Sequence, residues 1–562
     1  MEFPDLNDRG GLNSKSDSLP PKFYTQDRWT NSLNLRKKKI NEIIFKQRGL
    51  ERFKKDGNKE YEIVKENLNI EKELKNKIYD DIDIFLKEMK KNIKHENIEY
   101  NKYALYCLRS QITNNNNFNN KSYLSEELQK KDFISDILNL IQKYFNDNQI
   151  IYESLWIFIN IVYFLKDPSE LSLFLTNKNC INLYIKILDK KDNCLRFHIY
   201  WLISNLLVND KFNITQEVLF HLYMSPFFRL YLFKTLEDKI QVTENEMLNI
   251  FNILSQLSHF INDTYISLAS NNIQHFINYN SEVNYESIQE NNTYLFHASL
   301  KYFLTYVENP KLNFYCLFGL SKLSNFLQDQ QAYNEFFKSG LARKLVKEQI
   351  KLNEDCLDFI TQIIGNFLSC SPDELLDIVF IEEILSFFVK LIQKYPTRQL
   401  LKRDIFWCVS NITSGNKIFC TKFAESGMLE ITLQSIYTDN DTVINEALFT
   451  LLGFFDKENL DTIIKYHHLD YIKNLTLGLK NFKSKTKPGE KMINIELLER
   501  IFSCFGILFE IGELLKGNLK NKFVSDFEKN GGFEIIENIL SENQLSQNVQ
   551  ILGEQLLQSR NL

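Results

Sequence analysis

The sequence predicts an all-α protein built from stacked helical repeats, and three observations support this prediction. Apolar residues recur at helical spacing from about residue 80 onward, and short turns rich in Asn, Asp, Lys and Ser separate the helical segments. Glycine and proline are scarce, with 18 and 9 among 562 residues. Landmark residues return at a nearly constant spacing along the chain. A chain of this length exceeds one compact core, and an open array of repeats accommodates it.

The N-terminal region differs in composition from the rest of the chain. Residues 1–30 are polar and are predicted to be disordered. The basic segment at 31–57 carries a local charge of +7 from nine basic and two acidic residues, so the rest of the chain sums to about −12. The nine basic residues are Arg36, Lys37, Lys38, Lys39, Lys46, Arg48, Arg52, Lys54 and Lys55. We expect a flexible arm that becomes helical when a partner covers it; a solvated arm or a nuclear-localisation tract is the alternative.

A linker at 58–79 leads into a predicted repeat solenoid at 80–558, and a short tail follows at 559–562. The last long helix of each unit supplies the landmarks Trp156, Trp201, Leu248, Gln362, Trp407 and Phe449. The first three are separated by 45 and 47 residues, and the last three by 45 and 42. Units of this length with two or three helices are typical of armadillo or HEAT repeats. The longer step of 73 residues from Leu248 to Ser321 indicates an insertion around 262–290.

Glycines in three units favour armadillo over HEAT repeats. They occur within 338–350, 425–436 and 530–540, in each case before the expected middle helix. Glycine at this point permits the tight turn between a short first helix and the next one. We therefore predict about ten armadillo repeats, with a basic loop inserted at 480–491 in the ninth.

Composition and motifs argue against several functional classes. A net charge of −5 and a pI near 6.0 disfavour general nucleic-acid binding. No run of about 18 uncharged apolar residues occurs, and the N-terminus lacks a signal-peptide core, so we expect no membrane association. The nine cysteines lack CxxC spacing, and no phosphate-binding or nucleophile motif is present. We expect an intracellular protein with buried reduced thiols, no cofactor, no metal and no enzymatic activity.

A tryptophan followed four residues later by an asparagine is the central motif. It occurs in DIFWCVSNITSGN (404–416) and twice more, giving the pairs Trp407/Asn411, Trp156/Asn160 and Trp201/Asn205. Residues four apart lie on one face of a helix. A single Trp at such spacing is more often a core residue, but three of only four tryptophans follow this pattern in phase with the repeat. Repeated along a solenoid, indoles can hold the stems of Lys or Arg while amides bond the backbone of an extended peptide.

These segments resemble a known family. LKRDIFWCVSNITSGN (401–416), IIYESLWIFINIV (150–162) and LRFHIYWLISNLLVND (195–210) are similar to repeats of importin alpha, the adaptor for cargo with nuclear-localisation signals. RKKKINEIIFKQRGLERFKK (36–55) is similar to the segment of that family that binds importin beta and otherwise folds back as a mock cargo. The resemblance covers nearly the whole chain and implies a right-handed superhelical solenoid of about ten armadillo repeats.

The resemblance also implies site residues. A major cargo site would comprise Trp156, Asn160, Trp201, Asn205, Asp210 and Asn252. A minor site would comprise Asn366, Trp407, Asn411, Glu446 and Phe449. The chain departs from the family pattern at three positions, because Leu248 and Phe449 replace Trp and Gly453 replaces Asn.

The expected function is that of a nuclear import adaptor shuttling between cytoplasm and nucleus. Its inner groove would bind basic cargo, its nine basic residues at 36–55 would bind importin beta or compete for the groove in cis, and an export factor would recycle it. The alternative is a non-transport armadillo scaffold that binds other extended partners. A nucleic-acid-binding solenoid would require a basic groove, which the acidic body disfavours.

Overall fold

The computed structural model describes most of the predicted solenoid. It covers residues 82–114, 127–128, 130–164, 175, 178–208, 231–237, 242–269, 285–326, 330–347, 354–370, 376–485, 495–515, 521–541 and 545–561. The predicted disordered N-terminus (1–30), basic segment (31–57) and linker (58–79) lie outside the described residues, as does Asp210.

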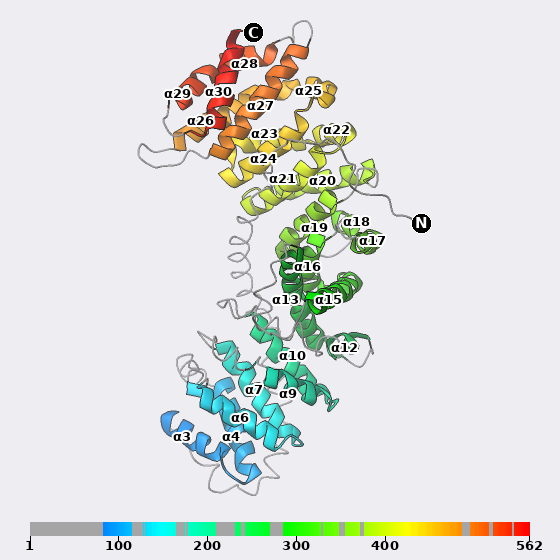
Figure 1. Cartoon of the computed structure of the whole chain (residues 1–562), viewed down its shortest axis with the longest axis vertical. Coiled ribbons are helices and arrows are strands. Elements are labelled where there is room, and N and C mark those ends of the chain that lie inside the picture. The colour runs from blue at the N-terminus through cyan, green and yellow to red at the C-terminus, as the bar shows by residue number, and fades with distance from the viewer. Residues whose placement is uncertain are drawn as a thin grey trace. The chain divides into compact units, whose positions relative to one another are not determined.

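The chain divides into two compact units, Met1–Asn249 and Ile250–Leu562, and each is described by itself. The helices of the first unit are α3 (Ile82–Ile93), α4 (Ile98–Asn114), α6 (Lys131–Lys143), α7 (Asn148–Phe164), α9 (Lys178–Leu188), α10 (Asn193–Val208) and α12 (Phe233–Glu237). Helix α13 (Glu244–Ala269) contains the division point. In the first unit α4 packs against α7, and α7 packs against α10 (Figure 1). Each repeat thus contacts the next through its last helix.

The second unit repeats this arrangement with more complete three-helix repeats. Its helices are α15 (Tyr285–Tyr306), α16 (Asn313–Leu323), α17 (Gln330–Lys338), α18 (Leu341–Val346), α19 (Leu357–Cys370), α20 (Ile378–Lys394), α21 (Gln399–Thr413), α22 (Lys417–Glu425), α23 (Met428–Thr438), α24 (Asp441–Phe454), α25 (Leu460–Lys465), α26 (Tyr471–Lys485), α27 (Ile495–Leu514), α28 (Lys522–Lys529), α29 (Gly532–Leu540) and α30 (Gln547–Gln558). Helices α16, α19, α21, α24, α27 and α30 pack in sequence, each against the next. We call these six helices, together with α4, α7 and α10, the ladder helices.

The predicted glycine turns are confirmed. Gly340, Gly427 and Gly531 have φ values of 63°, 83° and 73°, and each lies directly before the second helix of its repeat. This left-handed backbone conformation is costly for residues with a Cβ atom. Side-chain caps from Asn and Asp residues start several of the other helices. Asn440, for example, accepts a hydrogen bond from the backbone N–H of Val443 at 3.1 Å and caps α24.

Helices continue into the predicted insertion and into the predicted basic loop. At the insertion predicted around 262–290, α13 continues to Ala269 and α15 begins at Tyr285. The basic loop predicted at 480–491 was wrong at its start, because α26 continues to Lys485. Lys480 and Asn481 donate hydrogen bonds to the carbonyl oxygens of Asn530 and Tyr437, so contacts with neighbouring segments support the helix where composition alone marks a loop.

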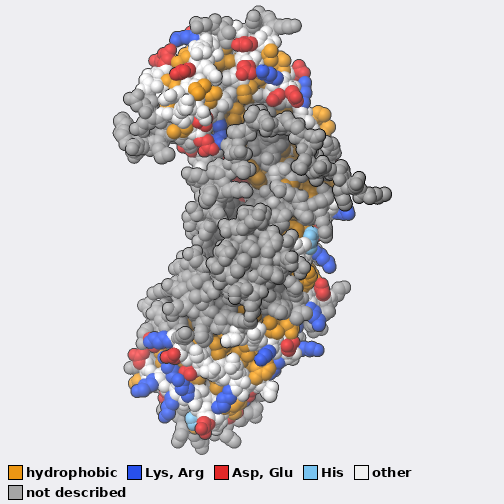
Figure 2. All heavy atoms as spheres, viewed as in Figure 1, with side chains coloured by type: hydrophobic (Ala, Val, Ile, Leu, Met, Phe, Trp, Pro, Cys, Tyr) orange, Lys and Arg blue, Asp and Glu red, His pale blue; other side chains and the backbone are white. Residues whose placement is uncertain are grey.

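The described part of the chain is an all-α, armadillo-like solenoid, as predicted. Leu, Ile and Phe side chains from all three helices of a repeat fill the core. On the face shown in Figure 2, acidic and basic side chains are interspersed over the described residues. Among the described helices, none combines the length and apolar character needed to span a membrane.

Candidate functional site

The Trp–Asn motif occupies one register in the ladder helices. Trp156, Trp201, Trp407 and Phe449 are each the ninth residue of their helix, in α7, α10, α21 and α24. Because consecutive ladder helices pack against each other, equal register places equivalent residues along one side of each unit. We call these four ring positions the rungs.

In the second unit, Asn325, Asn366 and Asn411 form a row, which we call the asparagine row. Asn366 and Asn411 lie in the ladder helices α19 and α21, and Asn325 lies in the short 3-10 helix Ser324–Phe326 that follows α16. Asn366 Nδ2 donates hydrogen bonds to Asn325 Oδ1 and Ser324 Oγ, both at 2.8 Å. Asn411 Nδ2 donates to the carbonyl oxygen of Gly365 at 3.4 Å. All three side chains are half-buried. An amide side chain offers two N–H donors and one acceptor oxygen, so Asn366 and Asn411 keep capacity to bond a peptide backbone.

Trp407 is a half-buried rung, as Trp201 is, and its ring rests on a glycine. A Cβ atom on Gly365 would lie 2.1 Å from Cζ3 of the Trp407 ring, so the ring lies directly over the backbone of α19. Within the described residues, no Lys or Arg side chain covers this ring. One face of the indole is therefore supported by α19, and the rung can accept a cation.

A carboxylate with an altered pKa lies close to this rung. The pKa of Glu446, on α24, is raised to about 7, mainly by burial, and the charges of Asp404 and Glu496 contribute to the rise. The guanidinium groups of Arg403 and Arg500 act in the opposite direction. Glu446 is thus a half-buried acid near neutrality, which a further positive charge would favour in its ionised form.

Phe449, the next rung, already carries a cation from the chain itself. The guanidinium carbon of Arg500, on α27, lies 3.9 Å from the centroid of the Phe449 ring. Arg500 also donates to Asn445 Oδ1 and to Glu496. The following position has no amide, because Gly453 stands there. A Cβ on Gly453 would lie 3.0 Å from the backbone carbon of Thr413, so the close approach of α21 and α24 leaves no room for an asparagine.

In the first unit, Trp156 is a packed residue with only 5% of its surface exposed. Its centroid lies 6.1 Å from that of Trp201 and 5.3 Å from that of His198. Burial lowers the pKa of His198 to about 4, and the Nδ1 atom lies 2.7 Å from the carbonyl oxygen of Cys194. A neutral imidazole therefore joins this aromatic cluster. Trp201 itself is half-buried.

Arg109 of α4 occupies the face of Trp156. Its guanidinium carbon lies 5.0 Å from the Trp156 centroid and 5.1 Å from that of Tyr106. Glu153 of α7 accepts two hydrogen bonds from this guanidinium, one of them of 2.5 Å from Nε. The chain's own arginine thus lies against two aromatic rings in the way proposed for a cargo side chain.

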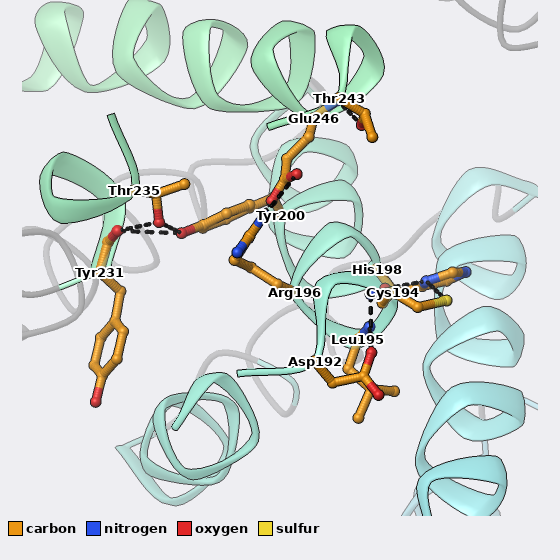
Figure 3. A network of polar contacts seen from close by, with 10 residues as sticks. All are labelled: Asp192, Cys194, Leu195, Arg196, His198, Tyr200, Tyr231, Thr235, Thr243 and Glu246. Atoms are coloured by element: carbon orange, nitrogen blue, oxygen red, sulfur yellow. Dashed lines mark hydrogen bonds and ion pairs between the residues drawn. The ribbon is translucent and has the colours of Figure 1, made fainter. Parts of the chain in front are cut away.

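A polar network fixes the position of α10 in the first unit (Figure 3). Asp192 caps the helix, because its Oδ1 accepts bonds from the N–H groups of Cys194 and Leu195 at 2.9 and 3.1 Å. Buried Arg196 forms an ion pair with buried Glu246 of α13. Figure 3 also shows Tyr200 bonded to Thr235, with 2.9 Å between their hydroxyl oxygens. These contacts hold the helix that carries Trp201.

The remaining predicted residues take different positions. Asn160 and Asn205 are half-buried in α7 and α10, as is Leu248 in α13. Asn252, in the second unit, is only 4% exposed, so its amide is largely enclosed. Asp210 lies outside the described residues.

Sequence reasoning missed Arg109, Gly365 and Arg500, although each contacts a rung. Gly365 had a signal, since an isolated glycine inside a helix indicates a close approach of another element. The arginines had none, because a surface arginine and a ring-stacked one look alike in sequence. The nine cysteines are thiols and six are buried; among the described residues, no cluster of His, Cys, Asp or Glu could hold a metal ion.

Comparisons with known proteins support the fold alone. No family model matches the chain, and no curated protein sequence matches it. An engineered protein of known structure is 13% identical with a TM-score of 0.56, covering 85% of this chain and 99% of its own. A structure described as concerning the interaction between cadherin and beta-catenin is 10% identical with a TM-score of 0.49. The match covers 85% of this chain and 94% of the other. A designed armadillo repeat protein in complex with the peptide (KR)4 is 19% identical with a TM-score of 0.36, covering 47% and 99%.

Proposed function

We propose that this protein is an importin-alpha-like adaptor that binds a lysine- or arginine-rich peptide segment of a cargo protein along its ladder helices. The observation that carries the proposal is the Trp407 rung, a half-buried indole supported by Gly365 and flanked by Asn366 and Asn411. A lysine or arginine stem would pack on the indole, with a cation–π contribution of about 0.5–2 kcal/mol. The amides would bond the peptide backbone and set its register.

Charge near this rung supports a basic ligand. Glu446 loses its proton near neutral pH, and a lysine brought to Trp407 would stabilise the ionised form. Asp404 and Glu496, on the adjacent helices, are paired with Arg403 and Arg500, so these five groups carry one net negative charge when Glu446 is ionised. This attraction would weaken with salt, because partly exposed charges are screened.

The proposal extends to the N-terminal basic segment through the resemblance. Residues 36–55 would bind importin beta as a helix, and in its absence they would compete for Trp407 in cis at high local concentration. The protein would then shuttle between cytoplasm and nucleus, with an export factor returning it. The structure favours the second unit as the principal cargo site, since Arg109 already covers Trp156.

The test is titration of a fluorescent lysine-rich peptide onto the full-length protein and onto a variant with Lys37, Lys38 and Lys39 changed to Ala. We expect tighter binding by the triple variant, and loss of that binding when Trp407→Ala and Asn411→Ala are added. Importin beta should bind the wild type and lose affinity for the triple variant. If the peptide binds neither form and importin beta ignores residues 36–55, the non-transport scaffold becomes the better account.

A further inference from the structure

Arg500 is held on the Phe449 ring by three separate contacts. Its guanidinium carbon lies 3.9 Å above the ring centroid, Nη1 donates to Asn445 Oδ1, and Nη2 lies 2.5 Å from Glu496 Oε1. Its side chain is only 13% exposed. A guanidinium placed on a ring, paired with a carboxylate and bonded to an amide has the contacts that a bound arginine ligand would seek.

Phe449 is the rung that follows Trp407. Both are the ninth residues of adjacent, directly packed ladder helices. Packed helices lie roughly 8–10 Å apart, and an extended peptide covers about 6.8 Å in two residues and 10 Å in three. A peptide with a lysine on Trp407 would therefore bring its second or third following side chain to Phe449.

The first unit shows the same device independently. Arg109 lies on the faces of Trp156 and Tyr106 and pairs with Glu153. Trp156 is the N-terminal rung of its unit, whereas Phe449 is the C-terminal rung of the other. In each unit an arginine from a neighbouring ladder helix fills the terminal rung.

We propose that Arg500 is a specificity-determining residue that fills the Phe449 rung and limits this part of the ladder to one basic side chain, the one on Trp407. The inference rests on the proposed function, because it assumes that Trp407 anchors a basic peptide. A second lysine would have to displace Arg500 from the ring, from Asn445 and from Glu496. This part of the second unit therefore selects peptides by one basic side chain. A second basic side chain two or three residues away adds no affinity.

The experiment measures the affinity gained from a second lysine. Two peptides carry one lysine, or two lysines spaced by two or three residues, in an otherwise neutral sequence, and are titrated by anisotropy onto the full chain. Arg500→Ala uncovers the Phe449 ring. Arg500→Gln keeps a hydrogen-bond donor for Asn445. Arg560→Gln is the matched control, since Arg560 also lies over a ring (Phe533, 5.4 Å) and pairs with a glutamate but lies off the ladder. Thermal unfolding verifies that each variant folds.

We expect the second lysine to change the affinity of the wild type and of Arg560→Gln by less than about twofold. In Arg500→Ala it should add about three- to tenfold, and Phe449→Ala in that background should remove the gain. Arg500→Gln should show a smaller gain. Wild-type binding through Trp407 with no gain in either Arg500 variant would overturn this inference and leave the proposed function intact. Absence of Trp407-dependent binding in the wild type and in both variants would overturn both.

Discussion

The same Trp–Asn pattern has two structural outcomes in the two units. In the first unit, Trp156 is buried beneath Arg109 and against Trp201. In the second, Trp407 is half-buried and rests on Gly365. The difference comes from the preceding ladder helix, which presents a large charged side chain in one case and a glycine in the other. A rung is therefore defined by its neighbour as much as by its own residue.

The largest predicted difference between the two units is the loss of stability when a tryptophan is removed. Trp156→Ala should lower the free energy of unfolding by about 3–5 kcal/mol, because it deletes a buried ring. Trp407→Ala should cost less, about 2–3 kcal/mol, because part of its ring is exposed to solvent, and it should weaken peptide binding by at least about tenfold. Thermal unfolding and peptide titration on the same samples measure both effects. Equal stability losses would contradict the assigned burial.

The ion pairs of Arg109 and Arg500, the two arginines that lie on rungs, should also differ in how much they stabilise the fold. Glu153 is 6% exposed, so Glu153→Gln should cost about 3 kcal/mol by leaving Arg109 as a buried cation with weakened compensation. Glu496 is 50% exposed, and Glu496→Gln should cost less than about 1 kcal/mol. Urea unfolding of the two matched variants checks this. A cost above about 2 kcal/mol for the second variant would show that its pair is effectively buried.

The units should respond to pH with opposite signs. The lowered pKa of His198, about 4 against 6.5, means that its contribution to stability is present above pH 6.5 and is lost as the pH falls toward 4. The raised pKa of Glu446, about 7 against 4.5, gives a contribution present below pH 4.5 and lost as the pH rises through 7. Between pH 7.5 and 5.5 each change amounts to about 1–2 kcal/mol.

Hydrogen exchange by mass spectrometry, corrected for intrinsic rates, resolves these changes region by region. Acidification from pH 7.5 to 5.5 should reduce protection in α7 and α10 and increase it in α21 and α24. Glu446→Gln should remove the second response and leave the first unchanged. A change of the same sign in both regions would exclude these two groups as the dominant titrating residues.

The last prediction concerns Gly365, the glycine beneath the Trp407 ring. Gly365→Ala places a methyl group against the Trp407 ring and should cost about 1–2 kcal/mol, because the ring can swing toward solvent. Peptide affinity should fall more than stability, since the indole leaves its supported position. Gly506→Ala is the control, because a Cβ at Gly506 meets open space. Unchanged peptide binding in Gly365→Ala would show that the Trp407 orientation is not required.

The fold could be predicted from the sequence, because it depends on features that recur along the chain. Helical apolar spacing, the forty-residue period and the left-handed glycines at 340, 427 and 531 are all local properties of the chain. The helix ends at Ala269 and Lys485 were not predicted, because both helices continue into polar stretches. In α26, Lys480 and Asn481 donate hydrogen bonds to the carbonyl oxygens of Asn530 and Tyr437, and such long-range contacts leave no mark in the local sequence.

The site was only partly predictable for a related reason. The register of Trp156, Trp201 and Trp407 follows from spacing, and the helix bounds place all three at the ninth position. Which ring is accessible depends on side chains about 45 residues away, such as Arg109 for Trp156 and Arg500 for Phe449. No pattern in the sequence marks these long-range contacts.

The most direct test of this account compares two tryptophans in one peptide titration. Labelled lysine-rich peptide is titrated onto the wild type, Trp407→Ala and Trp201→Ala, with folding verified by circular dichroism. The account predicts at least about tenfold weaker binding for Trp407→Ala and a change of less than about threefold for Trp201→Ala. The reverse order would contradict it and would place the principal site in the first unit.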